Sequence, residues 1–113
     1  MKSTLVKKKF GEKIYRVEQP NNRVIKIITQ SDYETNGESV LIVKETPICS
    51  LVLNQMTTTS VIIKAMTKVS LKPKIGYIDE YYEELLIEKG ACVEMEYFEN
   101  SWYILSSDGL KLN

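Results

Sequence analysis

Residues 92–106 read Cys-Val-Glu-Met-Glu-Tyr-Phe-Glu-Asn-Ser-Trp-Tyr-Ile-Leu-Ser, and this stretch decides the fold class. Apolar and acidic side chains alternate over residues 92–98, which is the two-residue period of a strand with one buried face. Glu99-Asn100 can form a two-residue turn, because asparagine tolerates the left-handed region of φ. The aromatic and aliphatic run 101–106 then returns as a second strand. The stretch therefore predicts an antiparallel β-hairpin.

Short β-branched runs bounded by turn residues recur along the rest of the chain. They are Val40–Val43, Ile48–Leu53, Val61–Ala65 and Val69–Leu71. Such short runs fit strands buried on both faces better than helices. Residues 77–87 contain good helix formers, but their apolar positions form no single stripe. We expect an irregular excursion or one helical turn there, then a strand at Leu85–Ile87. The sequence predicts an all-β fold, a small antiparallel β-sandwich or barrel.

The N-terminal part of the chain differs from the rest in charge. Residues 1–30 carry eight basic and two acidic side chains, whereas residues 31–113 carry seven basic and thirteen acidic ones. The runs Ile14–Val17 and Val24–Ile28 flank a Pro-Asn-Asn turn and predict a second hairpin. The polar segment Gln30–Ser39 is expected to connect this arm to the main module.

Two domains are therefore predicted, a basic attachment arm (1–30) and a β-module (31–113). A basic arm can meet an acidic surface on nucleic acid, on a protein shell or on a neighbouring copy of the chain. The alternative is a solvated basic strand pair that keeps a sheet edge from aggregating. The predicted partner contacts of the arm are Lys7, Lys8, Lys9, Lys13, Arg16 and Arg23.

The residue types needed for most catalytic sites are missing. The chain has no histidine, so Ser-His-Asp and Cys-His nucleophiles are excluded. Its five glycines are scattered and form no phosphate-binding loop. The acidic segment Asp79–Glu88 matches no EF-hand spacing and is interpreted as a solvated face. We expect no enzyme activity, no metal and no cofactor.

Aromatic residues crowd the C-terminal half and allow two interpretations. Tyr and Trp are favoured in cores and in subunit interfaces, and this interpretation is preferred. The alternative is a platform that stacks sugars or bases. The residues assigned to the core or to a subunit interface are Tyr97, Trp102, Tyr103 and Ile104.

No run of the sequence is long and apolar enough for a membrane span, and no apolar stretch follows the basic start to form a signal peptide. We therefore expect synthesis and assembly in a reducing cytoplasm. Cys49 and Cys92 are expected to be buried thiols, with a disulfide as the less favoured alternative.

The order of short motifs in residues 60–113 resembles a known family. The quoted motifs are Val61-Ile62-Ile63-Lys64-Ala65, Val69-Ser70-Leu71-Lys72-Pro73, Ile75-Gly76-Tyr77-Ile78-Asp79, Gly90-Ala91-Cys92-Val93-Glu94-Met95 and Asn100-Ser101-Trp102-Tyr103-Ile104-Leu105-Ser106-Ser107-Asp108-Gly109. They resemble a small β-module at the ends of phage tail fibres, head fibres and capsid decoration proteins. The acidic insert Glu80–Glu84 departs from the family, which has glycine and small residues there.

This resemblance implies a homotrimeric, non-catalytic module displayed on a virion. The expected function is a head-fibre or capsid decoration subunit, with the arm contacting the major capsid protein or other fibre proteins. A second hypothesis is a module that binds a host-surface glycan through its Tyr/Trp face. A third is a β-barrel that binds single-stranded nucleic acid through residues 2–26, which the acidic remainder of the chain disfavours.

Overall fold

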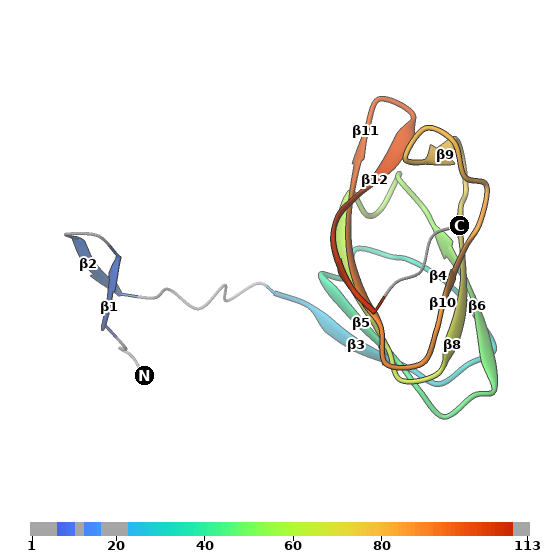
Figure 1. Cartoon of the computed structure of the whole chain (residues 1–113), viewed down its shortest axis with the longest axis horizontal. Coiled ribbons are helices and arrows are strands. Elements are labelled where there is room, and N and C mark those ends of the chain that lie inside the picture. The colour runs from blue at the N-terminus through green and yellow to red at the C-terminus, as the bar shows by residue number, and fades with distance from the viewer. Residues whose placement is uncertain (1–6, 11–12, 17–22, 110–113) are drawn as a thin grey trace.

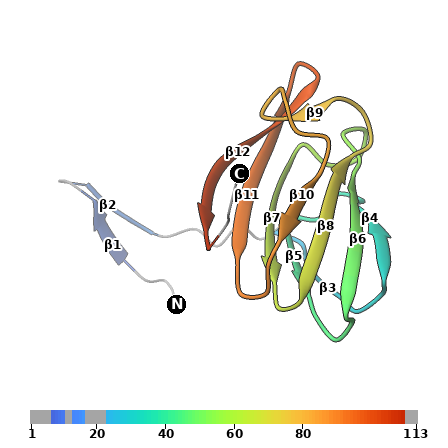
Figure 2. The same cartoon turned by 45° about the vertical axis from the view of Figure 1, so that its right-hand side comes forward.

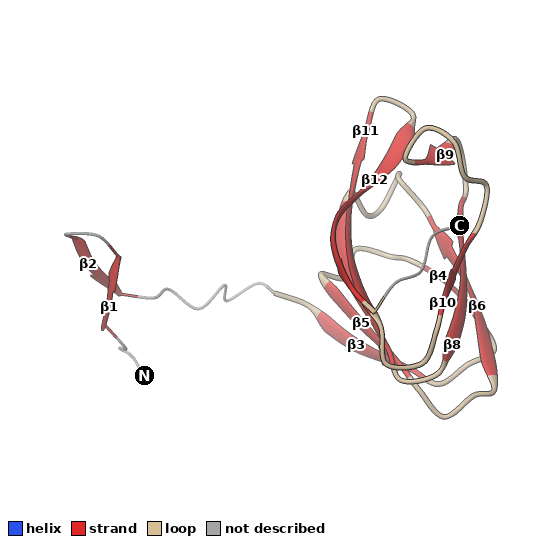
Figure 3. Ribbon diagram, viewed as in Figure 1, coloured by secondary structure: helices blue, strands red, loops and turns tan. Residues whose placement is uncertain are grey.

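The computed structural model describes residues 7–10, 13–16 and 23–109, and within these residues it contains strands and no helix (Figures 1 and 3). The strands are β1 (Lys7–Phe10), β2 (Lys13–Arg16), β3 (Ile25–Ile28), β4 (Asp32–Glu34), β5 (Val40–Val43), β6 (Ile48–Leu53), β7 (Ser60–Ala65), β8 (Lys68–Pro73), β9 (Tyr77–Ile78), β10 (Leu85–Ile87), β11 (Cys92–Phe98) and β12 (Ser101–Asp108). The all-β prediction is confirmed.

The module consists of two facing sheets, between which the chain alternates (Figure 2). One sheet has six strands in the order β3-β5-β7-β11-β12-β9, and the other has four in the order β10-β8-β6-β4. From β3 to β8, odd-numbered strands enter the six-stranded sheet and even-numbered strands enter the four-stranded one. Three successive coils are thus stacked in parallel, which is a solenoid-like arrangement.

The core lies between the two sheets and follows from the two-residue period of the strands. Leu41 of β5 pairs with Ile63 of β7, and Leu51 of β6 pairs with Leu71 of β8. All four side chains are buried. Parallel pairing in register places aliphatic residues of successive coils above one another. The apolar side chains of one coil are therefore covered in part by those of the next coil.

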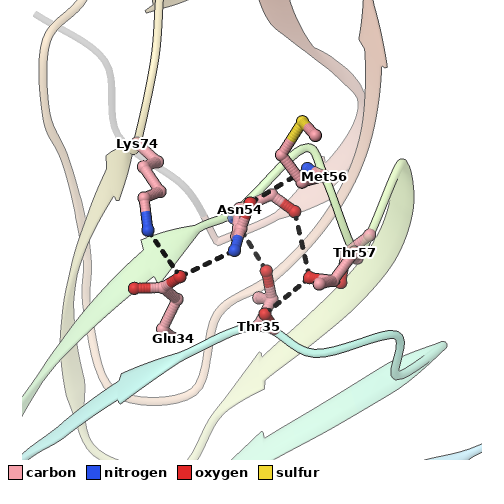
Figure 4. A network of polar contacts seen from close by, with 7 residues as sticks. Glu34, Thr35, Asn54, Met56, Thr57 and Lys74 are labelled. Atoms are coloured by element: carbon pink, nitrogen blue, oxygen red, sulfur yellow. Dashed lines mark hydrogen bonds and ion pairs between the residues drawn. The ribbon is translucent and has the colours of Figure 1, made fainter.

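Hydrogen bonds between loops hold successive coils in register (Figure 4). The Thr35 hydroxyl accepts a hydrogen bond from the backbone N–H of Asn54 (2.8 Å). The Thr57 hydroxyl donates to the Thr35 carbonyl (2.8 Å). The Glu34 carboxylate accepts bonds from the Asn54 side chain (2.7 Å) and from Lys74 (2.9 Å). Backbone groups that leave the strands at these corners therefore find partners, as buried polar groups require.

Antiparallel strands close the C-terminal end of the stack. β11 and β12 form the predicted hairpin, and Glu99 and Asn100 take φ of 46° and 72° in its turn. Trp102 of β12 is fully buried, and its ring lies 5.4 Å from that of Tyr97. A Cβ on Gly76 would lie 2.1 Å from the Asn100 carbonyl oxygen, so the loop before β9 packs against this turn only with glycine there.

Three details of the predicted architecture are wrong. The predicted hairpin of residues 14–17 with residues 24–28 does not form, because β2 pairs with β1 and β3 pairs in parallel with β5. Since β3 belongs to the module and Ile28 is buried, the predicted boundary at residue 30 lies too late. The pairing from β3 to β8 is parallel rather than antiparallel.

The strands predicted to be buried on both faces also alternate instead. Ile48 and Ser50 of β6, for example, are exposed between buried neighbours. Residues 77–87 contain strand and turn but no helix, and the strand at Leu85–Ile87 is present as β10.

Trp102→Ala should reduce the free energy of unfolding by about 3–5 kcal/mol, because it removes a fully buried indole from the core. Tyr81→Ala is the control, since 76% of Tyr81 is exposed. Denaturant melts measure both. A loss below about 1 kcal/mol for Trp102→Ala would contradict the packing described here.

Candidate functional site

The outward face of the six-stranded sheet carries an unusual apolar surface. The paired residues Ile25–Val40–Ile62 form one row across β3, β5 and β7, and Ile27, Ile42 and Lys64 form the next, in which the Lys64 ammonium donates to the Gly90 carbonyl (2.9 Å). Ile25 is 58% exposed and Ile27 is 51% exposed, and the other three aliphatic residues are half-buried. We call these five aliphatic residues the apolar half of the face. Outward positions of a two-sheet fold are ordinarily polar, so burial in this core does not explain them.

The same face becomes acidic on β11 and β12. Glu94 pairs with Ile62 of β7, and Glu96 pairs with Tyr103 of β12. The Tyr103 hydroxyl donates to the Glu80 carboxylate (2.6 Å), which brings a third acidic group to this side. Glu80, Glu94, Glu96 and Asp108 form what we call the acidic half of the face.

A hollow lies where the two halves meet. Its volume is about 220 Å³, and it is lined by Ile62, Cys92, Glu94, Ser106, Ser107 and Asp108. Serine and cysteine occupy little volume between longer neighbours, which leaves room above the sheet. The hollow is large enough for one big side chain, and it has aliphatic and acidic walls.

The outward face of the four-stranded sheet is different. Asp32, Ser50 and Ser70 form one row across β4, β6 and β8, and Glu34, Val52 and Lys72 form the next. Polar and charged groups therefore dominate, although Ile48 of β6 is 45% exposed and Leu86 of β10 is 47% exposed. Since both faces are built on the same stacked coils, the apolar half marks one side of the module as a contact surface.

A polar cluster closes the core between the edge strands β3 and β4. The Lys26 ammonium lies 5.1 Å from the centre of the Tyr33 ring, and the Tyr33 hydroxyl donates to the Glu38 carboxylate. Burial, together with the bond to Glu38, raises the pKa of Tyr33 to about 12. Burial opposes ionisation of Glu38, but bonds from Tyr33 and backbone amides hold its pKa below the ordinary value. An inward-pointing lysine on an edge strand also discourages pairing with further strands.

The residues predicted to contact partners divide into two groups. Lys7, Lys8 and Lys9 belong to β1, Lys13 and Arg16 belong to β2, and these two strands pair only with each other among the described strands. Arg23 is exposed just before β3.

Of the aromatic group, Trp102 lies in the core, where Tyr97 and Ile104 pack partly buried against it, and Tyr103 is half-buried on the outward face. A stacking platform that includes Trp102 is therefore wrong. Among the residues whose exposure the structure describes, the large aromatic ones that are exposed are Tyr77, Tyr81 and Phe98.

The described residues offer little for catalysis or metal binding. Cys49 and Cys92 are both free thiols, and burial raises the pKa of Cys49. No group of three or more Cys, Asp or Glu side chains in the described part of the chain is arranged to hold a metal ion. None of the described segments is a helix long and apolar enough to cross a membrane.

Sequence reasoning missed the apolar half of the face. The local pattern predicts half of an arm hairpin for Val24–Ile28 and a strand buried on both faces for Val40–Val43. Their outward side chains are neighbours only because β3, β5 and β7 pair in parallel. A local sequence pattern gives no information on this pairing. The signal available in the sequence was the lack of polar alternation in these runs.

Comparison with protein-family models and with curated proteins finds no match to this chain. Its surfaces must therefore be interpreted from their own chemistry.

The Tyr33–Glu38 contact should make stability depend on pH at both extremes. Because the pKa of Glu38 is lowered, its contribution is complete at neutral pH and is lost as the pH falls through the acidic range. Because the pKa of Tyr33 is raised, unfolding becomes easier as the pH rises from about 10 towards 12.

Tyr33→Phe should flatten the alkaline limb of this profile and cost about 1–3 kcal/mol at neutral pH, since buried Glu38 loses a donor. Melts across pH measure both effects, with Tyr81→Phe as the control. An unchanged alkaline limb in Tyr33→Phe would contradict the assignment.

Proposed function

We propose that this chain is a non-catalytic structural subunit of a phage particle, either a head-fibre or a capsid decoration protein. In this proposal the basic N-terminal segment joins the subunit to the assembly, and the acidic β-module projects from it as a homotrimer. The chain would be made in the host cytoplasm and would reside in the virion.

The observation that carries this proposal is the apolar half of the six-stranded face. Its five aliphatic side chains lie on adjacent strands by register, and two of them are more than half exposed. A flat aliphatic surface is suited to contact with protein, whereas small ligands bind in concave sites. The motif order in residues 60–113 adds the resemblance to virion modules.

Glycan binding is the second candidate function, and the exposed rings that could serve it do not include Trp102. Tyr77 and Phe98 pair with Ser101 from opposite sides, so both exposed rings lie at one end of the module. Aromatic rings and nearby carboxylates are groups that bind sugars. The hollow beside Ile62 and Glu94 and a second one over Asp32, Glu34 and Val52 both have linings that include neither ring, and for this reason the structural role is preferred.

The purified chain should form a trimer with three times its 13.0 kDa mass. Ile27→Ser should weaken the association, because it places a hydroxyl on the apolar half. Leu86→Ser is the matched control, since Leu86 is 47% exposed on the other sheet and Ile27 is 51% exposed. Sedimentation equilibrium measures the masses. A folded monomer at high micromolar concentration would rule out the trimer.

Reversing three charges of the arm, with Lys7→Glu, Lys8→Glu and Lys9→Glu together, should abolish association with particles that lack this protein. Raised salt should weaken attachment of the unaltered chain, because screening shortens electrostatic range. Co-sedimentation with particles measures both, and Lys68→Glu, an exposed change on the module, is the control. Normal attachment of the reversed arm would show that the module makes the contact.

A further inference from the structure

We propose that the outward face of the six-stranded sheet is the docking surface for the β1–β2 arm, residues 7–16, of a neighbouring copy of this chain. The inference goes beyond the proposed function, because it assigns the arm a contact with a neighbouring copy of the chain. It does not require a phage particle. It follows from the chemistry of the face, from the composition of the arm and from the place where the arm enters the module.

The face requires a partner that is both apolar and basic. Its apolar half, on β3, β5 and β7, borders directly on its acidic half, since Ile62 pairs with Glu94. Lys64, whose ammonium already donates to the Gly90 carbonyl, is one basic group beside four carboxylates on this face, so two copies meeting face to face about a two-fold axis would place most carboxylates against carboxylates or against aliphatic groups. Both arrangements are unfavourable, since like charges repel and an unpaired buried charge is costly. A second face of the same kind is therefore a poor partner.

The arm has the required composition. Residues 7–16 carry five basic side chains and one acidic one, together with Phe10, Ile14 and Tyr15. Residues 31–113, by contrast, carry thirteen acidic and seven basic side chains, so the basic excess of the chain lies in its N-terminal part. The hollow of about 220 Å³ between the two halves has walls that suit an aromatic or long basic side chain.

Chain geometry gives the arm access to this face. β1 and β2 pair with each other and with no other described strand. The arm enters the module at β3, the edge strand that carries Ile25 and Ile27. Eight residues separate Arg16 from Ile25, enough for a span of about 26 Å. Three strand spacings, the distance from β3 to β11, amount to about 14 Å, so this length lets the arm reach the face of its own module or that of a copy beside β3, and the dilution test below separates the two.

Arm exchange would also produce the closed trimer of the proposed function. A contact between the arm of one copy and the face of the next is heterologous, because the two surfaces differ. Heterologous contacts produce rings when the rotation between copies closes. An isologous contact between identical faces would favour a dimer instead.

Cys92 provides a native reporter for this docking. It lies in the hollow and is half-buried, whereas Cys49 is fully buried and serves as an internal control in the same chain. If a neighbour's arm covers the hollow, alkylation of Cys92 should be slow in the concentrated protein. It should accelerate about tenfold on dilution below the association range or in 1 M salt, where the Debye length is about 3 Å.

Charge exchange separates docking from mere destabilisation. The triple reversal Lys7→Glu, Lys8→Glu, Lys9→Glu should expose Cys92, and so should the pair Glu94→Lys, Glu96→Lys. Combining all five changes in one chain should restore both slow alkylation and the trimer mass, which damage to folding would not do. Asp32→Lys, on the outward face of the other sheet, is the control and should change neither.

Each other result overturns the proposal. Slow alkylation that persists on dilution would mean that the arm covers its own module. Equally fast alkylation in every form would mean that nothing covers the face. Failure of the five-fold variant to recover would mean that the arm and the acidic half do not pair. All measurements use the purified chain, so their failure is distinct from failure to attach to particles.

Discussion

The structure depends on the in-register parallel stacking of its three coils. From β3 to β8, each strand is followed in the sequence by a strand of the opposite sheet. The strand after that one is its neighbour in its own sheet. Aliphatic residues such as Leu41 and Ile63 are buried only because successive coils pair at matching positions. A stack of this kind must also be closed at its ends. The antiparallel hairpin of β11 and β12 closes one end, and the Lys26–Tyr33–Glu38 cluster closes the core at the other.

This constraint explains why the sequence predicts some elements well and others poorly. The β11–β12 hairpin was predictable because alternation, turn and return strand all lie within residues 92–106. The pairing of β3 with β5 was not, because eleven residues intervene, and they include a whole strand of the other sheet. Val24–Ile28 resembles half of a hairpin after Pro20-Asn21-Asn22, and only tertiary pairing reassigns it to the module.

The candidate surface was harder to predict than the fold for the same reason. Outward residues contribute little to the core, so local patterns carry no information on which of them are neighbours. Ile25, Val40 and Ile62 lie far apart in the sequence, yet they form one row. The charge division was visible in the sequence, and the structure adds that Glu94 and Glu96 share a face with that row. Together these features make one side of the module suited to a basic, partly apolar partner.

The most direct test joins the two surfaces chemically. Chains labelled with ¹⁴N and ¹⁵N would be mixed, treated with a carbodiimide, which couples only amines and carboxylates in contact, and digested for mass spectrometry. The account predicts mixed-isotope peptides that link Lys7, Lys8 or Lys9 of one copy to Glu94 or Glu96 of another. Two results would contradict the account. One is that every cross-linked pair from these lysines to the face carries a single isotope, which would mean links within one chain. The other is that these lysines link to acidic residues of the four-stranded sheet instead.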